Sequence, residues 1–110
     1  MAIRDFFSGE FSVSVVPGRD EITVVPAGEL DLTSVEHLAR EVDDLRRAGF
    51  RHVVIDLREL RFMDSQGMHL LLVLRRAAER DGETFRLIAG SEDVQRLFSL
   101  TGTVDLFDWA

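Results

Sequence analysis

The fold is decided by residues 51–82, RHVVIDLRELRFMDSQGMHLLLVLRRAAERDG, because the spacing of apolar residues changes within this stretch. It begins with RHVVIDL, a short apolar run rich in β-branched residues that is typical of a buried strand. Residues 65–80 repeat apolar side chains at helical spacing and end near Asp81 and Gly82. The stretch therefore predicts a strand followed by a long helix, with residues 57–65 at the carboxyl end of the strand.

The flanking segments extend this pattern. Residues 10–18 and 20–28 are β-rich runs separated by a turn, and Pro26 is expected to end or bulge the second strand because it lacks an N–H. Residues 33–49 then change to helical spacing, with Thr33 and Glu36 as a capping box. Further along the chain we expect a strand at 84–90, a short helix at 91–102 with Ser91 as its cap and Gly102 as its stop, and a last helical turn or edge strand at 103–109.

The order of these segments is β-β-α-β-α-β-α, which indicates an α/β protein. We expect residues 1–110 to form a single domain, with a mixed, mostly parallel sheet of four to five strands covered by helices. Sites on such sheets usually lie beyond the carboxyl ends of the strands. Residues 28–31, 57–65 and 90–91 fall at such ends.

Composition excludes several classes of function. The chain has no cysteine, and its thirteen cations against twenty acids leave a formal charge of −7, which disfavours binding to nucleic acid. All thirteen cations are arginine, so neither a phosphate-binding lysine nor a Schiff-base lysine is possible. The three histidines show no metal spacing, and we expect no metal or cofactor. No signal peptide is evident and the longest apolar run, residues 70–74, is too short to cross a membrane, so we expect a cytoplasmic protein.

Ser65 raises the question of catalysis. A nucleophile elbow requires glycine two residues before and two after the serine, and here Gly67 is present but Met63 stands at the first position. His69 lies one helical turn from Ser65, but no orienting acid or oxyanion hole accompanies the pair. A phospho-accepting role for Asp56 is rejected because that chemistry needs a lysine, so Asp56 is expected to bond backbone amides. The remaining local interpretation is that Ser65 caps the helix.

The helix at 65–80 has two faces when wound at about 100° per residue. One broad face is expected in the core and contains Gly67, Leu70, Leu71, Val73, Leu74, Ala77 and Ala78. The opposite face contains Ser65, Met68, His69, Leu72, Arg75, Arg76 and Glu79. Two apolar residues, Met68 and Leu72, beside an exposed serine suggest a contact surface. The alternative is that the tail, with Phe107 or Trp109, folds over them.

Three segments carry a resemblance to a known family. In order and spacing, GELDLTS, residues 53–82 and FRLIAGSEDVQRLFSLTG resemble the STAS domain family, and most of all its stand-alone anti-sigma factor antagonists. The resemblance covers about residues 10–108. Its most specific part is a strand, then Asp-Ser-x-Gly, then a leucine-rich helix.

The resemblance implies a regulator that binds an anti-sigma factor and thereby frees a sigma factor. In the family the anti-sigma factor is commonly a serine kinase that phosphorylates the antagonist, and a PP2C-type phosphatase reverses this. Ser65 matches the phosphorylated serine, Asp64 the acid before it, and Asp31 the acid of the Gly-x-Leu-Asp loop. With them, the expected partner-binding residues are Gln66, Met68, His69, Leu72 and Arg76.

The chain departs from the family pattern at three positions. Many relatives have serine or threonine in place of Arg58, a small residue in place of Gln66, and leucine or isoleucine in place of Met68. Arg58 and Gln66 bear on which kinase recognises the chain. We expect a non-enzymatic protein that is a monomer or weak dimer. The alternative is a STAS scaffold module in a stress-signalling or transporter-associated assembly, with Ser65 only a cap. An esterase that uses Ser65 and His69 is the third hypothesis.

Overall fold

The computed structural model describes residues 11–110. The chain forms, in order, β1 (Phe11–Pro17), β2 (Ile22–Leu30), α2 (Val35–Arg47), β3 (His52–Asp56), β4 (Leu60–Met63), α3 (Ser65–Arg80), β5 (Thr84–Ile88), α4 (Glu92–Thr101), a 3₁₀ turn η1 (Val104–Leu106) and β6 (Asp108–Trp109). The α/β class is confirmed. The tail was expected to be either a helical turn or an edge strand, and it contains both.

The sheet has six strands in the order β1-β2-β3-β5-β6, with β4 also paired to β2. Only the β1–β2 pair is antiparallel, so the sheet is mixed and mostly parallel as predicted. The count exceeds the expected four to five because of β4, whose four residues are too short to show a periodic pattern. The short strand β6 is the edge strand that was one expectation for the tail.

The long strand β2 has two parallel neighbours along one edge. Its residues 22–24 pair with β3, whereas Gly28 pairs with Leu60 at the start of β4. The prediction that Pro26 ends the strand is wrong, because β2 continues to Leu30 with Pro26 buried inside it. Pro26 lies where β2 has left β3 and not yet reached β4, and the register shift comes two residues later, between Gly28 and Glu29.

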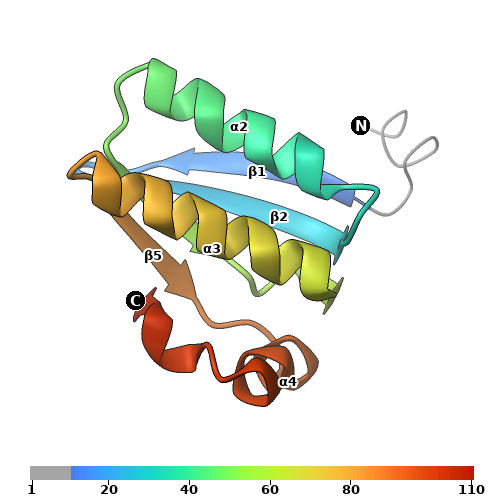
Figure 1. The fold of residues 1–110 in the computed structure, drawn as a ribbon. Helices are drawn as coiled ribbons and strands as arrows, with labels where there is room; N and C mark the ends of the chain where they lie inside the picture. Colours follow the sequence, from blue (N-terminus) through green and yellow to red (C-terminus); the bar gives the residue numbers. More distant parts are fainter. Residues whose placement is uncertain (1–10) are drawn as a thin grey trace.

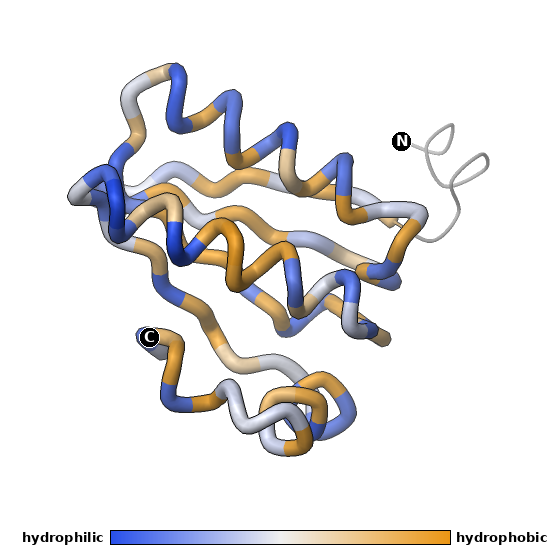
Figure 2. The backbone as a smooth tube through the Cα atoms, in the orientation of Figure 1, coloured by the Kyte–Doolittle hydropathy of each residue, from blue (hydrophilic) through white to orange (hydrophobic). Residues whose placement is uncertain are grey.

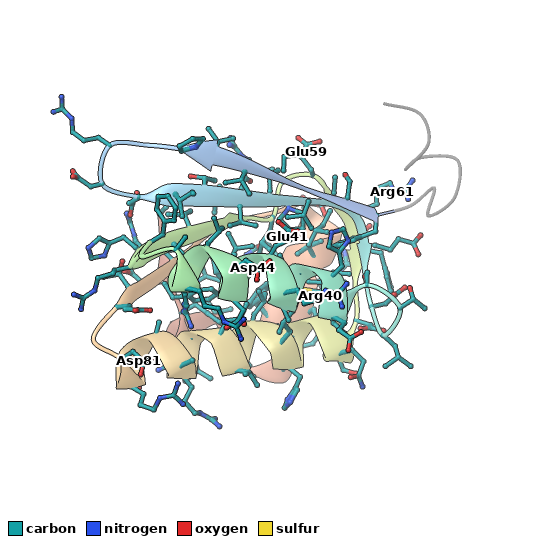
Figure 3. The ribbon with its side chains drawn as sticks, turned by 90° about the horizontal axis from the view of Figure 1, so that it is seen from above. Arg40, Glu41, Asp44, Glu59, Arg61 and Asp81 are labelled. Carbon is teal, nitrogen blue, oxygen red and sulfur yellow. The ribbon has the colours of Figure 1, made fainter. Side chains whose placement is uncertain are left out.

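Helices α2 and α3 lie side by side on one face of the sheet (Figure 1). Seen from above, the labelled Arg40, Glu41 and Asp44 of α2 lie on the helical side, and Glu59 and Arg61 lie on the sheet side (Figure 3). Helix α4 packs beside β4. Hydrophobic and hydrophilic residues alternate along α2 and α3 (Figure 2). Within residues 11–110, no helix is long and apolar enough to span a bilayer.

The core lies between the sheet and these helices, where Leu38 and Val42 of α2 and Leu71 of α3 are fully buried. Arg46 connects the two helices, since its guanidinium donates a 3.2 Å hydrogen bond from Nη2 to the Leu74 carbonyl. The α4 ends are as predicted. Ser91 accepts a 3.3 Å hydrogen bond from the Val94 amide, and Gly102 ends the helix in the left-handed conformation.

Gly67 lets the first turn of α3 approach the sheet. A Cβ at this position would lie 2.6 Å from Cγ of Met63 and 2.9 Å from the Leu30 carbonyl oxygen. Both distances are shorter than van der Waals contact, and a backbone carbonyl cannot move aside easily. The close approach therefore depends on the absence of a side chain at Gly67.

We predict that Gly67→Ala lowers the free energy of unfolding by about 2 kcal/mol, because it overpacks this contact. The sign of this stability change is informative, because replacing glycine by alanine within a helix normally stabilises a protein by about 1 kcal/mol. Urea unfolding followed by circular dichroism measures the change. Gln66→Ala, at the exposed neighbouring position, is the control. A gain in stability for Gly67→Ala would show that the contact is loose.

Candidate functional site

The site lies at the carboxyl ends of β2 and β4. Leu30 and Met63 are paired in the sheet, and the Asp64 amide donates a 3.2 Å hydrogen bond to the Leu30 carbonyl. The loop after β2, which carries Asp31, and the start of α3, which carries Ser65, therefore lie next to each other (Figure 1). The two segments that carry the expected site residues therefore meet at one end of the sheet.

Asp64, and not Ser65, caps α3. The Asp64 carboxylate accepts hydrogen bonds from the amides of Gln66 at 2.9 Å and Gly67 at 3.2 Å. The prediction that Ser65 is the cap is wrong by one residue. The extended conformation of β4 continues through Asp64, which has φ −108° and ψ −169°, so the carboxylate of Asp64 reaches the free amides first.

Ser65 is thus the first residue of the helix, and its side chain is exposed. No hydrogen bond joins its hydroxyl to any residue between 11 and 110, so neither His69 nor another described side chain activates it as a nucleophile would require. The hydroxyl is accessible and is not needed for the structure of the helix start.

The outward face of α3 differs from the predicted one. Ser65, Gln66, His69 and Arg76 are exposed as expected. Met68, which was expected to face solvent, is 4% exposed.

Thr103, at the start of the tail, lies over Met68, and its hydroxyl is 3.5 Å from the Met68 sulfur. The alternative interpretation therefore holds in part, because the contact is made by Thr103, whereas the expected contact was with Phe107 or Trp109. Leu72 is half-buried against the core, and Val73, which was expected inside, is 43% exposed. The exposed stripe of α3 therefore consists of Ser65, His69, Val73 and Arg76.

The loop after β2 is held by internal hydrogen bonds. The Asp31 carboxylate accepts from the Thr33 amide at 2.9 Å and the Thr33 hydroxyl at 2.6 Å. The predicted capping box is therefore wrong, because Thr33 bonds to Asp31 and α2 begins only at Val35. The hydrogen bond from the Thr33 hydroxyl, followed by that from the Thr33 amide, lowers the pKa of Asp31 below its ordinary value and keeps this carboxyl ionised.

A second carboxylate lies at the carboxyl end of β3. Asp56 accepts a 3.0 Å hydrogen bond from the Arg58 amide, which confirms the expected contact with a backbone amide. The Arg58 guanidinium forms a bidentate pair with the same carboxylate, at 3.0 and 2.8 Å, and holds the pKa of Asp56 below its ordinary value. The positive charge of Arg58, the family departure, is thus already paired within the chain.

Sequence reasoning missed three exposed apolar residues. Leu32 in the loop after β2 is 72% exposed, Phe62 of β4 is 47% exposed, and Leu100 of α4 is 76% exposed. Phe62 and Leu100 border a hollow of about 300 Å³ between β4 and α4. No periodic pattern marks a loop residue such as Leu32, and the exposure of the other two depends on how α4 meets β4. Among residues 11–110, no cluster of three or more histidine and acidic side chains is placed to hold a metal ion.

Comparison with known proteins places this chain in a family. Residues 14–109 match the family model described as STAS domain. The match spans nearly the whole chain, and the protein therefore belongs to the STAS domain family.

Relatives of known name share this architecture. The anti-sigma-B factor antagonist of Staphylococcus epidermidis is 28% identical over 95 residues, which cover 86% of this chain and 88% of the relative. The structure of the anti-sigma factor antagonist SpoIIAA in its unphosphorylated form is 25% identical, with a TM-score of 0.72, over 91% of this chain and 87% of that chain. The phosphorylated form of SpoIIAA from Bacillus has the same fold, with a TM-score of 0.67 and 23% identity over 91% of this chain and 90% of that chain.

We predict that Asp64→Ala lowers the free energy of unfolding by about 1 kcal/mol, because two helix amides lose their acceptor. Ser65→Ala should change it by less than about 0.5 kcal/mol, since the serine is exposed and its hydroxyl has no hydrogen-bond partner within residues 11–110. Urea unfolding of the two variants measures both values. A larger loss for Ser65→Ala than for Asp64→Ala would contradict the assignment of the cap.

We predict that Thr33→Val raises the pKa of Asp31 toward its ordinary value, because it removes the hydroxyl donor. Carboxyl carbon shifts measured by NMR during an acid titration give this pKa directly. A lowered pKa stabilises the folded state at pH values above the unfolded pKa of about 3.9, and this stabilisation is lost as the pH falls through the folded pKa. The stability difference between wild type and variant should therefore be full above about pH 4 and shrink below it.

The internal control for the titration is Asp81. The pKa of this carboxyl is lowered by the hydrogen bond from Arg80, so Thr33→Val should leave it unchanged. An unchanged pKa of Asp31 in the variant would contradict the role assigned to Thr33.

Proposed function

We propose that this protein is an anti-sigma factor antagonist that phosphorylation of Ser65 switches off. In its unmodified form it binds an anti-sigma factor that is itself a serine kinase, and so releases a sigma factor for transcription. Phosphorylation by that kinase weakens the complex, and a PP2C-type phosphatase restores binding. The protein acts in the cytoplasm through binding, without catalysis of its own, as a monomer or weak dimer.

The observation that carries this proposal is the division of roles between Asp64 and Ser65. Asp64 supplies the cap, so the Ser65 hydroxyl at the first position of α3 is exposed and makes no hydrogen bond to any residue between 11 and 110. A kinase can reach such a hydroxyl without unfolding the helix. The Staphylococcus relative and SpoIIAA are named as antagonists, and SpoIIAA is described in phosphorylated and unphosphorylated forms, which supports the same role here.

The charge added at Ser65 acts locally. A phosphate brings about −1.5 to −2 charges at neutral pH. The amides of Gln66 and Gly67 already bond to Asp64, so the phosphate would lie beside the Asp64 carboxylate and not directly on these donors. Its favourable interaction with the helix dipole and its repulsion from Asp64 are of similar size, each below about 1 kcal/mol. The fold should therefore persist, and the main cost arises when the charge is desolvated in a complex.

The proposed contact face consists of Asp31, Asp64 and the exposed stripe of α3, with Gln66 at the helix start and Leu72 at its margin. Met68 is left out of direct contact because the tail covers it. Charge at Ser65 then lies within the face. A loss of about 3 kcal/mol there weakens binding about a hundredfold.

We predict that a serine-kinase anti-sigma factor from the source genome transfers one phosphate from ATP to the wild-type chain and none to Ser65→Ala. Intact mass before and after incubation measures the transfer, and peptide mapping places it. Ser99→Ala, at an exposed serine of α4, is the control and should accept phosphate like wild type. Equal phosphate on wild type and Ser65→Ala would overturn the assignment of Ser65.

The structural half of the proposal is checked with Ser65→Glu. Its circular dichroism spectrum should match that of wild type, while its affinity for the anti-sigma factor falls. A large loss of helix in Ser65→Glu would contradict a local switch. Tight binding of an anti-sigma factor with no phosphate transfer would favour the scaffold alternative, in which Ser65 is not modified.

A further inference from the structure

Leu32 projects from the loop between β2 and α2, directly after Asp31, and is 72% exposed. Figure 2 shows a hydrophobic stretch in this loop, preceded by a hydrophilic one and followed by residues of intermediate hydropathy. A single exposed leucine on a protein surface is ordinary. Leu32 is of interest because the loop that presents it is rigidly held and lies against the start of α3.

Residues before and after Leu32 in this loop are held by hydrogen bonds. Before it, the Asp31 amide donates to the Ser34 hydroxyl at 3.0 Å, and the Asp31 carboxylate accepts from Thr33. After it, the Ser34 hydroxyl donates to the Glu29 carbonyl at 2.6 Å, and Ser34 is only 4% exposed. The backbone of Leu32 is thus held between two fixed points, so binding would cost little ordering entropy.

The surroundings of Leu32 are acidic. Asp31 precedes it in the chain, and Glu36 follows in the first turn of α2. Asp64 is held next to this loop by the hydrogen bond from its amide to the Leu30 carbonyl. Hydrogen bonds from Thr33 lower the pKa of Asp31 and so favour its charged form. A partner that fits this surface needs an apolar pocket for the leucine and a basic rim for the carboxylates. A phosphate on Ser65 would have to be desolvated when such a partner binds.

We propose that Leu32 is the apolar anchor of the Ser65 contact face and inserts into a basic-rimmed apolar pocket on the anti-sigma factor. This inference rests on the proposed function and adds a contact residue to it. The loop bonds of Asp31 and Ser34 present the leucine in its binding conformation, so Asp31 acts in part as a positioning residue. The surface extends the stripe of α3 across the end of the sheet to the start of α2.

The test uses the anti-sigma factor kinase of the source genome that binds the unphosphorylated wild-type protein. Its affinity is measured for wild type and for three variants, Leu32→Ser, Leu32→Met and Leu100→Ser. Isothermal titration calorimetry gives the dissociation constants. Leu32→Ser should bind about 30-fold more weakly, about 2 kcal/mol, which is the size expected when a buried leucine contact is lost. Leu32→Met should stay within about threefold of wild type, because methionine fills a similar volume.

Leu100→Ser is the matched control, since Leu100 is as exposed as Leu32 but lies on α4 beside the hollow with Phe62. It should bind within about twofold of wild type. All variants should unfold at the wild-type urea midpoint, because both leucines are at the surface.

The outcomes separate this inference from the function it rests on. If wild type binds and Leu32→Ser binds equally well, the inference is overturned and the proposed function stands. If Leu100→Ser loses as much affinity as Leu32→Ser, the anchor is not specific to this loop and the inference is again overturned. If no serine-kinase anti-sigma factor of the genome binds wild type, the proposed function is overturned and the inference with it.

Discussion

The first turn of α3 lies directly on the end of β2, and the site depends on this contact. The missing Cβ at Gly67 permits it, and the hydrogen bond from the Asp64 amide to the Leu30 carbonyl fixes it at 3.2 Å. Because Leu30 leads into the loop of Asp31, one contact sets the relative position of two segments about 30 residues apart along the chain. A side chain at Gly67 would push Ser65 away from that loop.

Around this contact, structural and functional roles fall on different side chains. Asp64 satisfies the helix amides, and Thr33 and Ser34 hold the loop after β2. Ser65 and Leu32 are exposed, and neither side chain makes a hydrogen bond in the part of the chain that the structure describes. Under the proposed function this division matters, because Ser65 can be modified without disturbing the bonds that shape the surface.

Much of the fold and part of the site could be predicted from local signals. The strand at 52–56, the helix at 65–80 and the caps at Ser91 and Gly102 follow from residue types within a few positions of each other. The errors arose where two candidates competed. Serine and aspartate are both common N-cap residues, so the sequence alone does not distinguish Ser65 from Asp64. Asp64 is the cap because the extended backbone of β4 continues through it. Thr33 fits a capping box, but its hydroxyl bonds to Asp31, two residues earlier.

By itself, the sequence determined the order of the elements, the α/β class and the place of Ser65 at the start of a helix after a strand. These features depend on periodicity and on residues adjacent in the chain. Only the tertiary structure decided which sides of α3 are exposed. Winding a helix shows which residues share a face, but not which faces are covered. Met68 is buried because Thr103, 35 residues further along, folds over it, and Val73 is exposed because nothing in residues 11–110 buries it.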